Sequence, residues 1–319
     1  MLLHGIGPGV LLLCFLLVGT AAFALGRRSA RGRRLRRDVD YFAGLDHLVN
    51  DRFDRATEVF TRLATKSQEA DIQFALGSLM RKRGEVDRAI AIHTELTNHR
   101  ELAVREQAKF ALGLDYMSAG LLDRAEEQLR GLLGSTQYRA AVLEKLAWVY
   151  EQQRDWRAAL DIWRELPAEE QRERATVAAH YCCELGEAAL AARELDAART
   201  QLAAARVHAA DAARVRMLAA RIAAAAGEEA LALELYGTAL LDSRTMREAF
   251  AQEARAALKS TGPVLDARLR ASQPLDEAPP AADARFRCEQ CGVASVTWHW
   301  RCPSCRSWDS LQSVNNRGL

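Results

Sequence analysis

The sequence predicts an all-α protein in which an array of repeated helices lies between an N-terminal transmembrane helix and a small C-terminal metal-binding domain. Three observations support this fold class: an uncharged apolar run near the N-terminus, a sequence repeat through the middle of the chain, and two Cys-x-x-Cys pairs near the C-terminus. Of the 319 residues only 19 are Gly and 7 are Pro, and Ala, Arg and Leu dominate, which favours helices. The net charge of only +2 hides a local excess of arginine directly after the apolar run.

Residues 1–26 are predicted to form the transmembrane anchor. No charged side chain occurs between Ile6 and Leu25, and about twenty helical residues cross the ~30 Å hydrocarbon core of a bilayer. The alternative is a cleaved signal peptide, because Ala22-Phe-Ala24 resembles a small-x-small cleavage site. Against this alternative, the first four residues contain no Lys or Arg, and the arginines follow the apolar run, where they would oppose export. A retained anchor is therefore the preferred interpretation.

Residues 27–37 form an Arg-rich juxtamembrane segment with seven arginines in eleven positions. Such arginines keep their side of a membrane segment in the cytoplasm, so the N-terminus is predicted to lie outside and the remaining chain inside. The run could alternatively bind nucleic acid, but beside an apolar span it is better explained as a topology signal that also meets anionic lipid headgroups. The topology residues are Arg27, Arg28, Arg31, Arg33, Arg34, Arg36 and Arg37.

Residues 38–270 are predicted to form an array of helical repeats. An alanine followed four residues later by a bulkier side chain recurs at steps of 33, 36, 34, 39 and 34 residues. A period of about 34 residues is typical of the tetratricopeptide repeat, a helix–turn–helix unit that buries its apolar face by stacking on its neighbours. A generic helical bundle is the less favoured alternative. The marker pairs are Ala56/Phe60, Ala89/His93, Ala125/Leu129, Ala159/Trp163, Ala198/Leu202 and Ala232/Tyr236.

Several further features of this array follow from its sequence. A small residue is expected twelve positions before each marker alanine, where two helices touch, as at Gly77 and Gly113. An expanded turn is expected at 165–171, a capping helix at 245–259 and a linker at 271–284. Stacked repeats curve into a superhelix with a concave groove that binds peptides or protein surfaces.

Arg81 and Lys109 are candidates for partner binding in this groove. The alternative for each residue is an ordinary solvated helix face.

The C-terminal residues 285–319 are predicted to bind one metal ion through Cys288, Cys291, Cys302 and Cys305. Each Cys-x-x-Cys pair places two sulfurs on one side of a tight turn, and two such turns give the four thiolates of a tetrahedral site. Zinc is expected in preference to iron, although four thiolates also hold a rubredoxin-type iron. Paired disulfides or a thiol-redox motif are the alternatives. Disulfides need an oxidising compartment, whereas this domain is predicted to lie in the cytoplasm. A thiol-redox motif is expected beside a βαβ pattern, which this sequence lacks.

Catalysis is not expected from this sequence. Four cysteines close the metal site, so no coordination position is left for a substrate. We find no phosphate-binding Gly-rich loop, no His-x-x-x-His pair and no nucleophile elbow.

Trp298, Trp300 and Trp308 are candidates for partner binding, with the alternative that they form the small core of the metal domain.

The combination of features resembles the lipopolysaccharide assembly protein B family over essentially the whole chain. The resemblance implies a non-enzymatic adaptor in the inner membrane of Gram-negative bacteria. Such an adaptor promotes degradation of the deacetylase that commits precursor to lipid A, and a membrane-anchored AAA+ zinc protease carries out this degradation. It also implies a rubredoxin-like metal domain that packs on the repeats. The residues that carry the resemblance are Cys288, Cys291, Gly292, Trp300, Cys302, Pro303, Cys305, Arg306, Trp308 and the segment Tyr41-Phe42-x-Gly44-Leu45.

Three function classes follow, of which the adaptor is preferred. Its expected partners are the protease, the deacetylase and other lipopolysaccharide assembly proteins, and a homodimer is left open. A redox protein with a rubredoxin-type iron is less favoured, because the ten-residue gap between the Cys pairs is shorter than in true rubredoxins. An RNA-binding zinc ribbon would need the few arginines beside Trp298 and Trp300 to hold nucleic acid, and no nucleic acid is expected.

Overall fold

The computed structural model describes residues 39–67, 69–272 and 285–314. The predicted transmembrane anchor, the Arg-rich segment and nearly all of the predicted linker lie outside these ranges. Within them, no helix combines the length and the apolar character needed to cross a membrane. The chain divides into two compact units, one ending at Val149 and one beginning at Tyr150.

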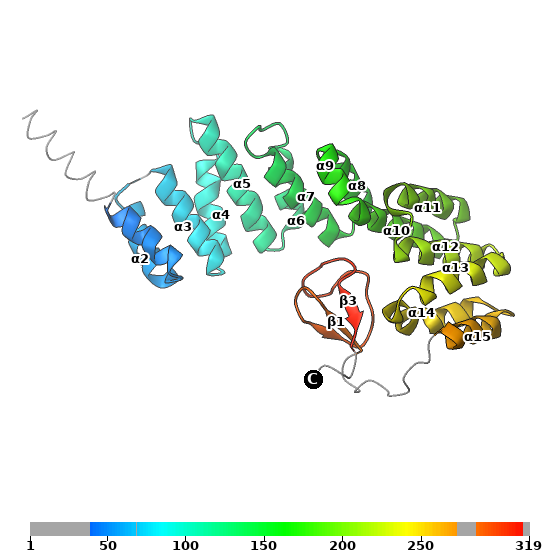
Figure 1. The fold of residues 1–319 in the computed structure, drawn as a ribbon. Coiled ribbons are helices and arrows are strands. Elements are labelled where there is room, and N and C mark those ends of the chain that lie inside the picture. The colour runs from blue at the N-terminus through cyan, green and yellow to red at the C-terminus, as the bar shows by residue number, and fades with distance from the viewer. Residues whose placement is uncertain (1–38, 68, 273–284, 315–319) are drawn as a thin grey trace, which may run out of the picture. The chain divides into compact units, whose positions relative to one another are not determined.

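The first unit is built from consecutive helices that pack on one another (Figure 1). A helical segment at residues 39–49 precedes the labelled elements. Each neighbouring pair is antiparallel because its connecting turn is short. The helices are α2 (Phe53–Ala64), α3 (Ala70–Lys82), α4 (Val86–Leu96), α5 (Leu102–Ser118), α6 (Leu122–Arg130) and most of α7 (Arg139–Gln153).

The second unit continues the helical pairs and ends in a small sheet. Its three strands are antiparallel in the order β2-β1-β3, and β3 packs on α14 (Figure 1). The elements are α8 (Trp156–Arg164), α9 (Ala168–Glu173), α10 (Ala175–Ala191), α11 (Leu195–Ala209), α12 (Ala213–Ala225), α13 (Glu229–Leu241), α14 (Arg244–Ala257), α15 (Gly262–Ser272), β1 (Phe286–Cys288), β2 (Ala294–Ser295) and β3 (Leu311–Ser313).

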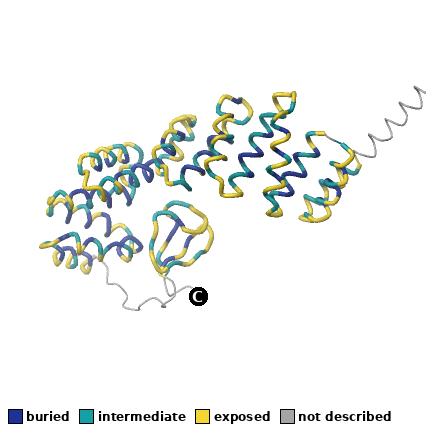
Figure 2. The backbone as a smooth tube through the Cα atoms, turned by 180° about the vertical axis from the view of Figure 1, so that it is seen from behind, coloured by how far each residue is buried: buried dark blue, intermediate teal, exposed yellow. Residues whose placement is uncertain are grey.

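The repeat markers explain why these helices pair. All six marker alanines have 0% exposed surface, and Figure 2 shows buried backbone along the facing sides of the helices. A Cβ added at Gly77 would lie 2.4 Å from Nε2 of His93, and one at Gly44 would lie 2.7 Å from the Phe60 ring. The helices therefore approach too closely for any side chain at these crossings. The mostly helical repeat architecture predicted from the sequence is confirmed.

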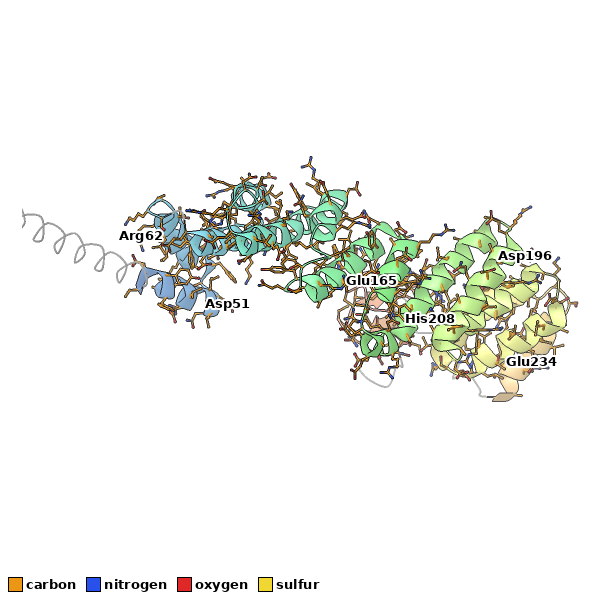
Figure 3. The ribbon with its side chains drawn as sticks, turned by 90° about the horizontal axis from the view of Figure 1, so that it is seen from above. Asp51, Arg62, Glu165, Asp196, His208 and Glu234 are labelled. Atoms are coloured by element: carbon orange, nitrogen blue, oxygen red, sulfur yellow. The ribbon has the colours of Figure 1, made fainter. Side chains whose placement is uncertain are left out.

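Charged side chains lie on the outer surface of the helices. Arg62, Asp196 and Glu234 are exposed (Figure 3). The segment at 165–171, expected as an expanded turn, contains the start of the six-residue helix α9. The predicted capping helix corresponds to α14, which Ser243 caps by accepting a hydrogen bond from the Met246 amide.

The turns between paired helices use left-handed backbone. Gly84, Gly120 and Gly227 have φ of 80°, 73° and 78°, and Arg154 and Arg193 adopt φ of 58° and 63° at corresponding turns. Glycine reaches this region without steric cost, whereas residues with a Cβ do not. The short turns therefore depend on a single left-handed residue each.

Replacing Gly84 with alanine is expected to lower the free energy of unfolding by about 1 kcal/mol, because left-handed backbone costs a residue with a Cβ about 1–2 kcal/mol. The added methyl group itself meets nothing within 4 Å, so the effect comes from the backbone alone. Urea unfolding followed by circular dichroism measures it. Gly134→Ala is the matched control, since Gly134 also has open space but no positive φ. Equal unfolding midpoints for the two variants would contradict the argument.

Candidate metal centre

Two matching turns carry the four cysteines. Strand β1 ends at Cys288, and the amide of Gly292 donates to the Cys288 carbonyl at 2.9 Å. In the second turn the amide of Arg306 donates to the Cys302 carbonyl at 3.0 Å. Gly292 and Arg306 both have left-handed backbone, with φ of 74° and 66°. The two turns thus have the same hydrogen bond and the same left-handed last residue, which is Gly292 in the first turn and Arg306 in the second.

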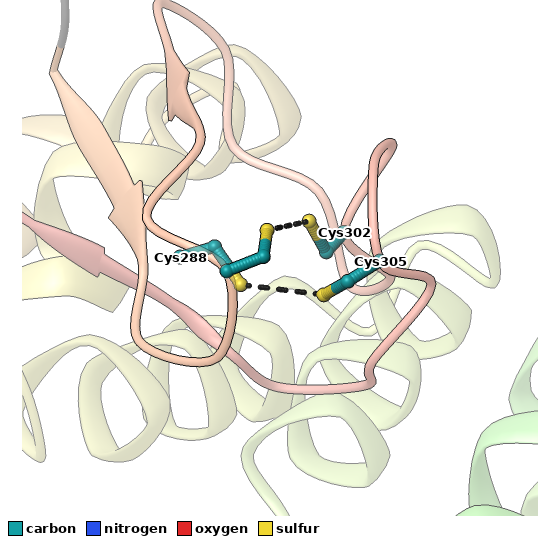
Figure 4. Close-up of side chains that lie close together, drawn as sticks. Cys288, Cys302 and Cys305 are labelled. Atoms are coloured by element: carbon teal, nitrogen blue, oxygen red, sulfur yellow. Dashed lines mark hydrogen bonds between the residues drawn. The ribbon is translucent and has the colours of Figure 1, made fainter. Parts of the chain in front are cut away.

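The four sulfurs converge on one point. Sγ of Cys288 lies 3.6 Å from Sγ of Cys305, and Sγ of Cys291 lies 3.7 Å from Sγ of Cys302 (Figure 4). All four sulfurs lie within 4.8 Å of one another, and none forms a disulfide. Tetrahedral zinc–sulfur bonds of about 2.3 Å require sulfurs about 3.8 Å apart. The donor set and its spacing therefore fit a four-coordinate metal ion.

Local hydrogen bonds lower the pKa of two of the four cysteine thiols and so favour their thiolate form, which binds metal ions. The Ser310 hydroxyl, 3.3 Å from Sγ of Cys288, and nearby backbone amides lower the pKa of the Cys288 thiol to about 6. The Ser307 hydroxyl lowers the pKa of Cys305, whereas burial raises that of Cys302 to about 11. A bound cation would supply the charge that allows the buried Cys302 to ionise as well.

The metal domain is joined to α7 through Arg301. Its Nη2 lies 2.6 Å from Oε2 of Glu151, and its Nη1 donates to the Glu151 carbonyl at 3.0 Å. Its Nε donates to the carbonyl of Arg306, inside the second Cys turn, at 3.0 Å. One guanidinium therefore contacts both the metal-binding turn and the end of a repeat helix, which its fixed fork of donors allows.

The three candidate tryptophans pack within the second unit. The Trp308 ring stacks on His180 at 4.6 Å and 9°, and the Trp300 ring stacks on Phe250 at 5.4 Å and 20°. Trp298 contacts Phe250 and donates to the Leu311 carbonyl at 3.1 Å. The three indoles therefore join the core of the small sheet to the helices, and a role in partner binding stays a prediction for them.

A buried ion network lies beneath the indoles. The guanidinium of Arg214, only 2% exposed, lies 5.4 Å from the Trp300 ring and 5.5 Å from the Trp308 ring. Its Nη2 lies 2.7 Å from Glu184 and 3.1 Å from Glu187. Burial opposes the charge of Arg214, but Glu187 and Glu184 together raise its pKa. Arg214 thus stays charged and presents its face to both rings.

Arg81 forms an ion pair within the first unit, and its side chain is 19% exposed. Its Nη1 lies 2.6 Å from Oδ1 of Asp115, which is fully buried, and the other oxygen of Asp115 lies 2.5 Å from Nδ1 of His93. The sequence did not predict this buried carboxylate one repeat later, and a part of Arg81 in partner binding stays a prediction. Lys109 is half-buried on α5, and its part in partner binding stays a prediction.

Three residues of the repeat helices contact the metal domain but were not predicted from the sequence: Glu151, His180 and Arg214. His180 and Arg214 each stand six residues before the small residue of their repeat, Gly186 and Ala220. A polar side chain recurring at one repeat position is the signal that could have identified two of them. Nothing in the sequence singles out Glu151 among the other acidic residues.

Comparison with known proteins places these features in context. The family model described as "Rubredoxin metal binding domain" matches residues 286–313. Lipopolysaccharide assembly protein B of Escherichia coli K12 is 29% identical, in an alignment covering 96% of this chain and 98% of the relative. The protein of the same name from Haemophilus influenzae is 31% identical over 54% of this chain and 48% of its own length.

A solved structure is also similar. The C-terminal part of a TPR repeat-containing protein from Cytophaga hutchinsonii is 14% identical, with a TM-score of 0.45 over 74% of this chain and 96% of that one.

Substitution of Cys302 by serine is expected to abolish stoichiometric metal binding while the repeat helices stay folded. A structural four-thiolate site loses one ligand, and metal binding supplies much of the folding free energy of so small a domain. Metal analysis and far-UV circular dichroism measure the two effects. Ser304→Ala, in the same turn but without a sulfur ligand, should keep one metal ion per chain. Loss of most of the helical signal in Cys302→Ser would contradict this separation of the array from the metal domain.

Proposed function

Since the chain is a homologue of lipopolysaccharide assembly protein B along nearly its whole length, we propose that it regulates lipopolysaccharide assembly as a non-enzymatic adaptor. The observation that carries this proposal is the extent of the homology, which includes the metal domain as well as the repeats. Helical repeats alone occur in proteins of many functions. Their combination with this metal domain is far more specific.

The proposed mechanism is recruitment. The repeats and the metal domain hold the deacetylase that commits precursor to lipid A and bring it to a membrane-anchored AAA+ protease. An anchor at residues 1–26, with the remaining chain in the cytoplasm, would confine the adaptor beside the protease and raise the effective concentration of the pair. The closed set of four cysteines supports a structural use of the metal, because no ligand position remains for a substrate.

Depletion of the protein from its host is expected to raise the amount of the deacetylase and of lipopolysaccharide, because degradation of the deacetylase slows. Immunoblotting of the deacetylase measures the effect, with its transcript level as a control for synthesis. Restoring the wild-type chain should reverse the increase, and restoring Cys302→Ser should not. An unchanged deacetylase level after depletion would refute the adaptor proposal.

Zinc is the metal that we propose for the four-Cys site, since the site is small and closed and zinc needs no redox partner. The purified protein is then expected to be colourless and to contain one zinc ion per chain. Visible absorption together with metal analysis checks this. A coloured protein that bleaches on reduction would instead support a rubredoxin-type iron.

A further inference from the structure

The metal domain covers the first helices of successive repeats in the second unit. Glu151 comes from α7, His180 from α10, Arg214 from α12 and Phe250 from α14, and each contacts the metal domain. In stacked helical repeats, the first helices line the surface that receives protein ligands. The chain's own metal domain therefore covers the surface that receives protein ligands in other repeat proteins. We call these four residues and their neighbours the groove of the second unit.

The contacts in this groove combine ion pairs, hydrogen bonds and ring packing. Arg301 donates two hydrogen bonds to Glu151, and Asp309 lies 2.8 Å from Nε2 of His180. The Trp308 indole stacks on His180 and lies against Arg214. Ion pairs and rings over guanidinium groups are typical of interfaces that can separate, because their polar groups can be solvated again. The groove thus takes an arginine and an indole presented close together.

The docking residues depend on the metal-binding turns. Arg301 is next to Cys302, and its Nε holds the Arg306 carbonyl in the turn. Trp308 pairs with Arg301 through a β-bridge, and the Asp309 amide donates to the Trp300 carbonyl at 2.9 Å. A segment this short keeps its shape mainly through its metal ion. Loss of the ion would therefore release the contacts with Glu151 and His180 together.

We propose that the metal-loaded domain is a displaceable internal ligand of this groove, and that loss of the metal opens the groove to a partner segment carrying an arginine beside an aromatic residue. This inference rests on the proposed function, in which the repeats bind proteins. Coupling between two sites is reciprocal. If the metal favours docking, then docking must favour retention of the metal by the same factor.

The first test measures metal retention in the full-length protein. Glu151→Gln removes the carboxylate that binds Arg301 but touches no cysteine, so zinc transfer to a chromogenic chelator should be about tenfold faster than in wild type, within the usual range of coupling between sites. Glu144→Gln, on the exposed face of the same helix, is the matched control and should leave the rate unchanged. Equal rates for wild type and Glu151→Gln would overturn the coupling.

The second test uses the wild-type protein and so does not depend on how a variant folds. Removing zinc under reducing conditions should increase hydrogen exchange in α10 and α12, while α3 and α4 of the first unit serve as an internal control. A short fluorescent peptide that carries an arginine beside a tryptophan, and no cysteine, should bind the zinc-free protein at least tenfold more tightly than the zinc-loaded one. Unchanged exchange in α10 and α12, or no preference of the peptide for the zinc-free protein, would overturn the proposal. Either failure would leave the deacetylase levels in depleted cells, and hence the adaptor role, unaffected.

Discussion

The interaction between Arg301 and Glu151 is the contact on which the arrangement of the second unit depends. The two side chains are 13% and 15% exposed, so each would be a poorly solvated charge without the other. Because the same guanidinium holds the Arg306 carbonyl, the pair links the metal-binding turn to the end of α7. Trp308 adds a bond from its Nε1 to Oε1 of Glu151 at 3.4 Å, and Tyr181 donates to the same oxygen at 2.6 Å. The Glu151 carboxylate therefore accepts hydrogen bonds from a repeat helix and from the metal domain.

In each unit, ion pairs that include a buried side chain join neighbouring helices. In the first unit Asp115 accepts from Arg81 and hydrogen-bonds with His93, which joins three consecutive helices. In the second, Arg214 and Arg221 share Glu187 across α10 and α12. Removing one member of such a network leaves an uncompensated charge, which usually costs more than the network contributes when intact. These networks join neighbouring helices in an array whose apolar contacts are mostly alanine and leucine.

The metal centre shows where local sequence suffices and where it does not. The spacing of the cysteines and the glycine after Cys291 predicted both turns, because each turn is closed by hydrogen bonds between residues four apart. The docking of the domain could not be predicted in this way. Glu151 and Arg301 are 150 residues apart, and neither differs in type from the many other charged residues of the chain. The three tryptophans were predicted as candidates for partner binding, but whether they face a partner or the chain's own helices depends on where the domain lies.

The sequence by itself determined the helical repeats, their pairing and the four cysteines of the candidate metal site. Each of these follows from short-range rules: a small residue where two helices cross, a left-handed residue at each turn, and sulfurs held on tight turns. Only the tertiary structure decided that Arg81 pairs with the buried Asp115, and which surface of the repeats the metal domain covers. The physical reason is that a charged or aromatic side chain can meet either solvent, a partner or a distant part of its own chain. That choice is made by the long-range packing that brings residues such as Glu151 and Arg301 together.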